Sequence, residues 1–390
     1  MRWRYRDTVL TLCTLAFFVT MVGRLAISPV IPAITDEFAV SNAVIGIALS
    51  GMWLAYGLAQ YPSGVLADRY GEWLIILAAV GGTVAFGLFI AAAPIFAAFF
   101  LGTVLLGGFA GLHYSVATSL LAGTYDRVGT AVGIHNNGGT VAGLVAPVAA
   151  AWIGTTYGWR YAVGFVAVIG IPTVALFAWK VRPTEPKRPD EPLRSRFAFD
   201  PAIELLSRPA IAFTVVLAIV GEFSWQGLAS FLPTFLVEYH GQSTTMAGVV
   251  FALYFVAQAP GQVIVGAVGD RIGYDTTIAG CMFVGSVGVG LLVIAPNLSV
   301  IVAAVLLLGV AMSFGAALMP RFLQEMTEKE QNAGFGLVRT VYMVIAASGS
   351  GVIGVLSDFQ GWIATLAFLG FLLLSIVAII SLNRIFNWGY

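Results

Sequence analysis

The sequence predicts an all-α membrane protein in which twelve transmembrane helices form two pseudo-symmetric six-helix bundles. Three observations predict this fold class: the chain is more apolar than a soluble protein, long apolar runs recur along it, and one charged motif occurs twice. Of the 390 residues, 59% are hydrophobic and only 10% are charged, whereas a soluble domain carries about 25% charged residues. We therefore expect an integral membrane protein.

The apolar runs are long enough to cross about 30 Å of hydrocarbon as helices. Short breaks at Pro94 and at Pro296-Asn297 separate the third run from the fourth and the ninth from the tenth. The first run follows several arginines, as in a signal peptide, but at about 25 residues it is too long for the apolar h-region of one, so we expect an uncleaved first helix. The expected spans are 8–33, 42–67, 73–93, 95–123, 129–153, 160–180, 209–236, 245–268, 276–295, 297–321, 332–356 and 360–382.

A charged motif occurs at the end of both the second and the eighth span. Residues 64–71 read GVLADRYG, and residues 266–273 read GAVGDRIG in the same register. A Gly-Trp pair at 158–159 returns at 361–362, before the sixth and the twelfth span. Two copies with one orientation are what a transporter built from parallel repeats requires.

The longest polar stretch begins at Arg182 and contains several prolines and charges of both signs. Such a composition is typical of an extended, solvated linker. It divides the chain into an N-terminal six-helix bundle (1–181), a cytoplasmic linker (182–208) and a C-terminal six-helix bundle (209–390).

The basic residues predict the orientation. Apart from Arg24, Arg160 and Arg339, every Lys and Arg lies on one side of the predicted spans, which includes both termini and the linker. The positive-inside rule places that side in the cytoplasm. We therefore expect a multi-pass protein of the plasma membrane with both termini in the cytoplasm.

The motif at 64–71 closely resembles the loop 2–3 motif of the major facilitator superfamily, and residues 158–161 (GWRY) resemble the opening of its sixth span. The resemblance covers essentially the whole chain. It implies the fold of that superfamily and a secondary transporter, not an enzyme.

The chain departs from the family pattern at three places. The family loop usually ends in basic residues, whereas this chain has Glu72-Trp73. The family's fourth span usually carries an arginine associated with proton coupling, whereas this chain has Thr103 there. The glycine-rich antiporter pattern of the fifth span is only approximated at residues 139–147.

The loop motif is expected to act as a conformational latch. Asp68 lies at the cytoplasmic end of the second span, where its carboxylate can meet the free N–H groups that begin a neighbouring helix, worth roughly 0.3–2 kcal/mol. The resemblance implies that this neighbour is the eleventh span, which begins near 332–336. The alternative is a solvated turn between two helices. The motif comprises Gly64, Asp68, Arg69 and Gly71, with Asp270 and Arg271 in the second copy; its glycines allow a close approach and a tight turn.

Ionisable side chains inside spans point to the substrate site. Arg24, Glu222 and Arg339 lie in spans one, seven and eleven, at roughly 2.5–3.5 kcal/mol or more each if centred and unpaired. We expect them to face a cavity between the two halves, where an arginine from each half suits bidentate capture of a carboxylate or phosphate. The alternative is that Glu222 pairs with an arginine and only holds helices together. The expected substrate-binding residues are Arg24, Arg339, Gln226, Asn136, Tyr114 and Trp225.

Three side chains are candidates for carrying a coupled proton. His113 and His135 lie in spans four and five, and histidine titrates near physiological pH. Each histidine can instead be a hydrogen-bonding packing group. Glu222 is the preferred candidate, because burial favours the protonated form of a carboxyl group.

Other functions fit the sequence less well. A membrane enzyme would need paired carboxylates or a nucleophile and a base at membrane depth, and a channel would not need two matched halves. No nucleotide-binding loop, metal-ligand cluster, catalytic triad or basic nucleic-acid stripe occurs in the sequence, so we expect no cofactor, no metal and no nucleic acid.

We expect a monomeric transporter that moves a small solute through a central cavity by alternating access, with a proton or sodium as coupling ion. The two arginines favour an organic or inorganic anion. The alternative is an efflux antiporter for multiple drugs or amphipathic cations, which the aromatic content and Glu222 would suit.

Overall fold

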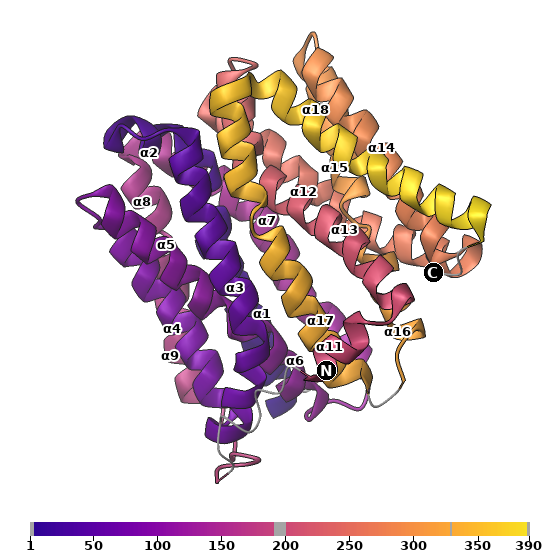
Figure 1. The fold of residues 1–390 in the computed structure, drawn as a ribbon. Coiled ribbons are helices and arrows are strands. Elements are labelled where there is room, and N and C mark those ends of the chain that lie inside the picture. Colours follow the sequence, from indigo (N-terminus) through magenta and orange to yellow (C-terminus); the bar gives the residue numbers. More distant parts are fainter. Residues whose placement is uncertain (1–3, 191–199, 328–329, 388–390) are drawn as a thin grey trace. The chain divides into compact units, whose positions relative to one another are not determined.

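A computed structural model describes residues 4–190, 200–327 and 330–387, and the side chains of these ranges except 200–202 and 330–335. Every regular element in the described ranges is a helix (Figure 1). Within these ranges, eleven helical runs are long and apolar enough to cross a membrane. The longest, Gly336–Phe386, contains a non-helical residue at Gly361, where the sequence predicts the boundary between spans eleven and twelve. The predicted all-α fold class is confirmed.

The helices begin and end a few residues away from the predicted limits. The first run extends over Tyr5–Phe38 rather than 8–33, because two prolines that were expected inside a span lie instead where short helical segments begin. Pro29 and Pro32 occupy the first turns of η1 and α2, where the missing N–H of proline costs nothing. The run therefore consists of α1, η1 and α2 in succession, with Val30 (φ −107°, ψ 8°), where η1 meets α2, outside the α-helical conformation.

The chain separates into two compact units. Unit 1 consists of Met1–Val40 and Ala48–Ala198. Its helix α1 packs against α7 and α9, and α4 packs against α5. Its elements are α1 (Tyr5–Leu25), η1 (Ser28–Val30), α2 (Ile31–Phe38), most of α3 (Asn42–Tyr70), α4 (Glu72–Ala91), α5 (Phe96–Gly111), α6 (His113–Ala122), α7 (Val128–Tyr157), α8 (Trp159–Gly164) and α9 (Val166–Lys180).

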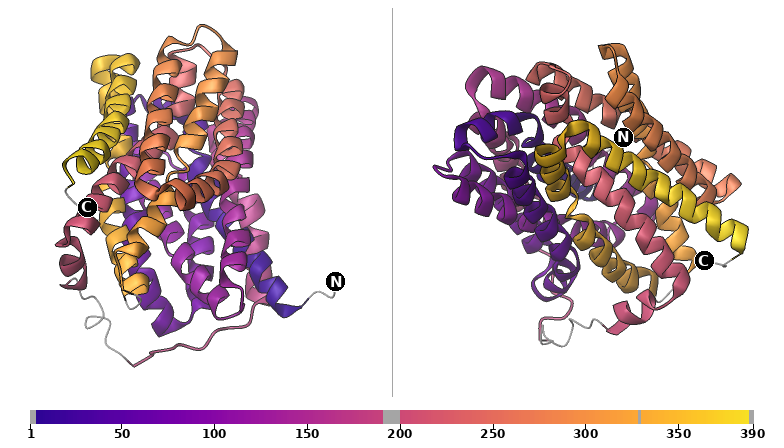
Figure 2. Two further views of the ribbon diagram at one scale, coloured as in Figure 1. Left: turned by 90° about the vertical axis from the view of Figure 1, so that its right-hand side faces the viewer. Right: turned by 45° about the horizontal axis from the view of Figure 1, so that its top comes forward.

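Unit 2 consists of Ser41–Ile47, which begin α3, and Phe199–Tyr390. Helices α14 and α15, drawn in orange, run side by side in Figures 1 and 2 and pack closely. After the start of α3, its elements are α11 (Asp200–Leu206), α12 (Pro209–Glu238), α13 (Thr244–Ile272), α14 (Tyr274–Ile294), α15 (Leu298–Ala311), α16 (Gly315–Gln324), α17 (Glu330–Ala346) and α18 (Gly349–Phe386).

Close helix contacts occur where small residues meet, as expected for a membrane protein. In unit 1, Gly138 lies against the Thr14 backbone and Gly139 against the Phe17 ring of α1, whereas Gly133 on the same helix α7 has open space around it. In unit 2, Gly354 lies against the backbone of Asn42 at the start of α3. Glycines of α7 and α18 therefore allow close helix contacts within their own units.

The sequence repeat is visible in the backbone. Gly71 and Gly273 follow α3 and α13 with φ, ψ values of 86°, 145° and 91°, 147°. Conformations with positive φ and extended ψ are open almost only to glycine. The two copies of the charged motif therefore end in the same kind of corner.

A second pair of repeated glycines makes the same helix contact in each unit. A Cβ on Gly107 of α5 would overlap the Met52 carbonyl oxygen of α3, and a Cβ on Gly309 of α15 would overlap the Tyr254 carbonyl oxygen of α13. Two helices whose backbones touch in this way leave room only for glycine.

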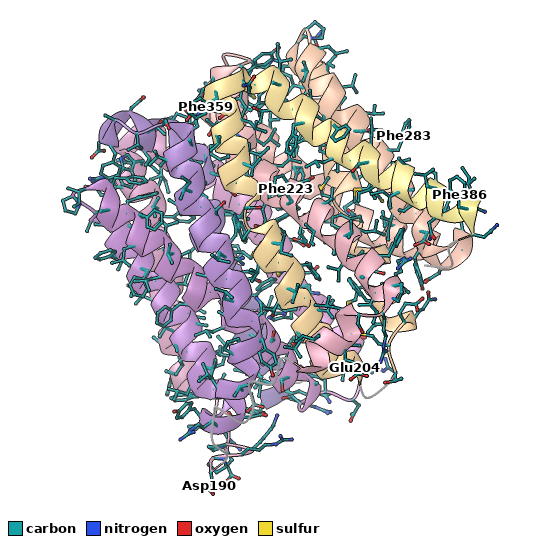
Figure 3. All side chains as sticks on the ribbon, viewed as in Figure 1. Asp190, Glu204, Phe223, Phe283, Phe359 and Phe386 are labelled. Carbon is teal, nitrogen blue, oxygen red and sulfur yellow. The ribbon has the colours of Figure 1, made fainter. Side chains whose placement is uncertain are left out.

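Large apolar side chains lie on the outside of unit 2. Phe283, Phe359 and Phe386, labelled in Figure 3, are 54%, 78% and 61% exposed. Such side chains are unfavourable in water and are stable in the hydrocarbon of a bilayer. The outer surface therefore agrees with the membrane-spanning character of the helices.

Candidate functional site

The guanidinium group of Arg24 lies inside unit 1, near the end of α1, and Arg24 is only 4% exposed. Its Nε donates to the Thr20 carbonyl oxygen at 3.1 Å, and one terminal nitrogen lies 2.7 Å from the sulfur of Met21. Its Cζ lies 4.1 Å from the centre of the Tyr56 ring and 5.2 Å from the centre of the Trp53 ring. The charge is therefore held by aromatic faces and one carbonyl oxygen.

The two histidines that the sequence singles out meet in unit 1. The Nε2 atoms of His113 (α6) and His135 (α7) lie 3.1 Å apart, and neither residue is exposed. The Phe17 ring stacks on both imidazoles, with ring centres 5.9 and 4.9 Å away. A hydrogen bond between two Nε2 atoms requires that one of them carries a proton and the other does not.

Unit 1 holds further polar side chains on the same helices as this histidine pair and on α3. Tyr114, a predicted substrate residue, places its ring 5.8 Å from that of His135. Asn136, another predicted residue, has a buried Oδ1 atom with no hydrogen-bond partner. Ser115 donates to Gln60 Oε1 at 3.2 Å, while Gln60 Nε2 is buried without a partner. Sequence reasoning missed Gln60 as a site residue, although a glutamine inside the second span was the available signal.

A second buried polar group lies in unit 2. Glu222 (α12) lies within electrostatic range of Arg339 (α17) and of the Tyr254 hydroxyl (α13). The Tyr254 hydroxyl is buried and has no hydrogen-bond partner. Glu222 therefore has an arginine in its own unit, as the alternative interpretation of this residue required.

Gln226 lies one helical turn from Glu222 and is fully buried. Both polar atoms of its side-chain amide lack a hydrogen-bond partner. A buried unsatisfied polar group costs roughly 1–3 kcal/mol, so a ligand or water that bonds to this amide would be stabilising. Nearby on the same helix, Ser230 is hydrogen-bonded to Ser350 of α18, with 2.7 Å between the hydroxyl oxygens. Trp225, the remaining predicted substrate residue, is half-buried on α12.

The charged motif is found at the expected helix ends. The Asp68 carbonyl oxygen accepts a hydrogen bond from the backbone N–H of Arg188 at 2.8 Å. The Asp270 carboxylate accepts one from the Tyr274 hydroxyl at 2.9 Å. No described atom lies within 4 Å of a Cβ built on Gly64, so the close approach expected there is not seen. The side chains at 330–335, where the latch was expected to end, lie outside the described residues.

The arrangement of these residues offers no metal site. Among the described residues, no group of three or more His, Cys, Asp or Glu side chains is placed to hold a metal ion. Cys13 and Cys281 are both buried free thiols. These residues can form hydrogen bonds, interact with charged groups and bind protons.

Comparison with known proteins assigns the family. A model of the Major Facilitator Superfamily matches residues 13–243 and 215–386. The chain belongs to the major facilitator superfamily. It is therefore a multi-pass membrane protein of a family of transporters that bind small-molecule substrates and are not enzymes.

Proteins with similar sequences include several that are named as transporters. The superfamily member described here is 24% identical over 381 residues to an uncharacterized MFS-type transporter of Methanocaldococcus jannaschii, covering 94% of this chain and 96% of that protein. It is 21% identical over 280 residues to the hexuronate transporter of Bacillus subtilis, covering 69% and 65%. It is 24% identical over 346 residues to a probable nitrate transporter of Staphylococcus haemolyticus, covering 84% of each protein.

Solved structures agree on the fold. The crystal structure of a D-xylose–proton symporter matches 99% of this chain and 98% of its own, with a TM-score of 0.76 and 16% identity. At this identity the similarity concerns the fold and not the substrate.

Proposed function

We propose that this superfamily member is a secondary active transporter that moves a small organic or inorganic anion across the plasma membrane by alternating access. We further propose that it works as a monomer with both termini in the cytoplasm, and that its bundles (1–181 and 209–390) are the moving bodies joined by the linker 182–208. Arg24 is the residue on which the choice of an anion depends.

The environment of Arg24 supports an anion because the positive charge is stabilised without being neutralised. A desolvated cation–π contact contributes about 2 kcal/mol or more, which is comparable to the roughly 2.5–3.5 kcal/mol needed to place an arginine at the centre of a membrane helix. No carboxylate among the described residues of unit 1 lies within ion-pair distance of the guanidinium. A bound anion would supply the missing negative charge.

Each unit contains a buried amide that would donate a hydrogen bond to an anion bound in that unit. Gln60 Nε2 in unit 1 and Gln226 Nε2 in unit 2 are buried donors without an acceptor. Carboxylate and nitrate oxygens accept hydrogen bonds from groups of this kind. In unit 2, Arg339 is the positive charge that we propose for substrate binding, and its interaction with Glu222 reduces that charge.

The named relatives support the same class of substrate. Hexuronate and nitrate, which two relatives are named for, are both anions. Neither name fixes the substrate of this chain, since both identities are below one quarter.

A coupling ion is also part of the proposal, and a proton fits the described residues best. The hydrogen-bonded pair of His113 and His135 can take up one proton, and Glu222, which interacts electrostatically with Arg339, is a second group that can change its charge. Proton uptake at any of these groups would alter the electrostatic potential of the same unit.

A ligand screen on purified protein tests the proposed substrate class. D-glucuronate, nitrate and benzoate form the anionic panel, and tetraphenylphosphonium and ethidium form the cationic panel. We expect anions to raise the melting temperature of the wild type and to have no effect on Arg24→Gln. Arg6→Gln is the matched control, because Arg6 also lies over a tyrosine ring (Tyr125, 5.5 Å) but near the N-terminus of the chain.

Two results would contradict the proposal. Stabilisation by the cationic panel alone would favour efflux of amphipathic cations instead. If anions raised the melting temperature of Arg24→Gln as much as that of the wild type, Arg24 would not be part of the anion site. Uptake of radiolabelled D-glucuronate or nitrate into proteoliposomes, with and without a pH gradient, then measures transport and its coupling to protons.

A further inference from the structure

The beginning of the linker lies against unit 1 instead of leaving it directly. The corner that it contacts is formed by the end of α3, Gly71 and the start of α4. Thr184 accepts a hydrogen bond from the Trp73 backbone N–H through its side-chain oxygen at 3.0 Å. The Arg188 backbone N–H donates to the Asp68 carbonyl oxygen at 2.8 Å. Asp190, labelled in Figure 3, closes the described part of this segment.

An ion pair fastens the same segment. Lys187 Nζ lies 2.6 Å from Glu72 Oε1, and it also approaches the Ser119 hydroxyl of α6 at 3.5 Å. The Glu72 side chain is only 7% exposed, while that of Lys187 is 53% exposed. A carboxylate so buried needs a partner, and the linker supplies it.

The contacts supply a hydrogen-bond acceptor that the first turn of α4 lacks. The first N–H groups of a helix have no partner within the helix and are usually met by a side chain of the residue before it. That residue here is Gly71, whose positive φ excludes other residues and which has no side chain to offer. Thr184 takes over this role for Trp73, the second residue of α4, although it lies far away in the sequence.

The same contacts explain why Gly71 and Glu72 have these identities. A Cβ on Gly71 would overlap the Thr184 carbonyl oxygen, so the linker as well as the backbone conformation requires glycine. Glu72 places a negative charge in the first turn of α4, which the helix dipole favours. It stands where the family motif usually has basic residues, and in this chain the cation comes from Lys187.

We propose that residues 182–188 form a strap that caps α4 and holds the corner carrying the Asp68 motif in place. The linker is then attached to unit 1 at the motif itself, so a displacement of the linker acts on the last turn of α3. The inference rests on the proposed transport function only for the role of the motif, while docking of the strap is independent of any substrate.

Hydrogen exchange measured by mass spectrometry on the purified full chain tests the strap without a substrate. Thr184→Val keeps the shape of the side chain and removes the acceptor, whereas Thr184→Ser keeps the hydroxyl. We expect the amide of Trp73 to exchange roughly fivefold faster in Thr184→Val, which corresponds to the loss of one hydrogen bond, and at a near-native rate in Thr184→Ser. We expect amides in residues 68–70 to exchange faster in Thr184→Val with Lys187→Gln.

Swapping the charges of Glu72 and Lys187 tests the ion pair between them. Lys187→Glu should accelerate exchange at the corner, and Glu72→Lys combined with Lys187→Glu should restore the wild-type rates. Lys180→Glu is the control, because its Nζ lies over the Trp179 ring and makes no contact with the corner.

Two outcomes would overturn the inference. Unprotected exchange at Trp73 and Arg188 in the wild type would mean that the strap is not docked. Faster exchange confined to 182–188 in the variants, with 68–70 unchanged, would mean that the strap does not hold the motif. Neither outcome depends on whether an anion is transported, so failure of the proposed function would be recognised separately.

Discussion

Replacing either of two repeated glycines by alanine should destabilise the unit that contains it. The Cβ of Gly107→Ala would overlap the Met52 carbonyl oxygen and lie 2.8 Å from its carbon and 2.9 Å from its Cα. These are backbone atoms of α3, so the clash is relieved only by moving two helices apart. Overpacking of this kind costs about 1–3 kcal/mol, while alanine gains up to about 1 kcal/mol over glycine within a helix.

Because the clash is with backbone atoms, the cost lies in the upper part of this range, about 2–3 kcal/mol, and the expected net loss is about 1–2 kcal/mol after the gain from alanine. For a unit of this size it corresponds to a fall of about 2–8 °C in melting temperature. Gly309→Ala should behave alike, since its Cβ would overlap the Tyr254 carbonyl oxygen. Fluorescence-detected size-exclusion chromatography after heating measures the shift in detergent.

Two other helical glycines, one in each unit, serve as controls. At Gly108 the nearest atom to an added Cβ is the Ala55 Cβ at 3.8 Å, and at Gly290 no atom lies within 4 Å. Alanine should be neutral or stabilising at both positions. Equal shifts for Gly107→Ala and Gly108→Ala would refute the argument that backbone contact sets the cost.

Three further outcomes are expected. Asp68→Asn should shift the population toward the inward-open state and reduce transport with nearly native expression; unchanged transport and unchanged cysteine accessibility would refute the latch. Gly158→Ala and Gly361→Ala should each lower the free energy of unfolding by about 1–3 kcal/mol, because φ is 101° and 76° and an alanine would be strained there. No atom lies within 4 Å of either added Cβ, so backbone strain is the only cost; unaltered melting temperatures would contradict this. An impermeant maleimide added to intact cells should label Gln360→Cys, which is exposed in the break before span twelve, and not Glu185→Cys in the linker, with little background because the native Cys13 and Cys281 are buried; the reverse labelling would overturn the proposed topology.

The sequence was sufficient to predict those parts of the fold that depend on a local stretch of the chain or on a single residue. The apolar length of each span predicts a helix, and the glycines at 71 and 273 predict two equivalent corners because their conformation excludes other residues. Helix ends were less accurate, because Pro29 and Pro32 are compatible both with a span interior and with the start of a helix.

Contacts between distant positions could not be predicted in the same way. The sequence singled out His113 and His135 separately, but only the packing of α6 against α7 brings their rings to hydrogen-bond distance. The role of Thr184 in capping α4 left no local signal, because a threonine in a proline-rich stretch fits a solvated linker equally well. Glu72, noted only as a departure from the family motif, acquires a physical reason once Lys187 is placed beside it.

The central claim is that Arg24 binds an anion, and it can be tested by calorimetric titration of Arg24→Lys with the anion that most strongly stabilises the wild type. Lysine keeps the positive charge but loses the planar fork that binds two oxygens at once. If Arg24 contacts the anion directly, affinity should fall at least tenfold in Arg24→Lys, whereas Arg6→Lys should bind like the wild type. Near-native affinity in Arg24→Lys, with the fold intact, would contradict bidentate capture of an anion at this residue.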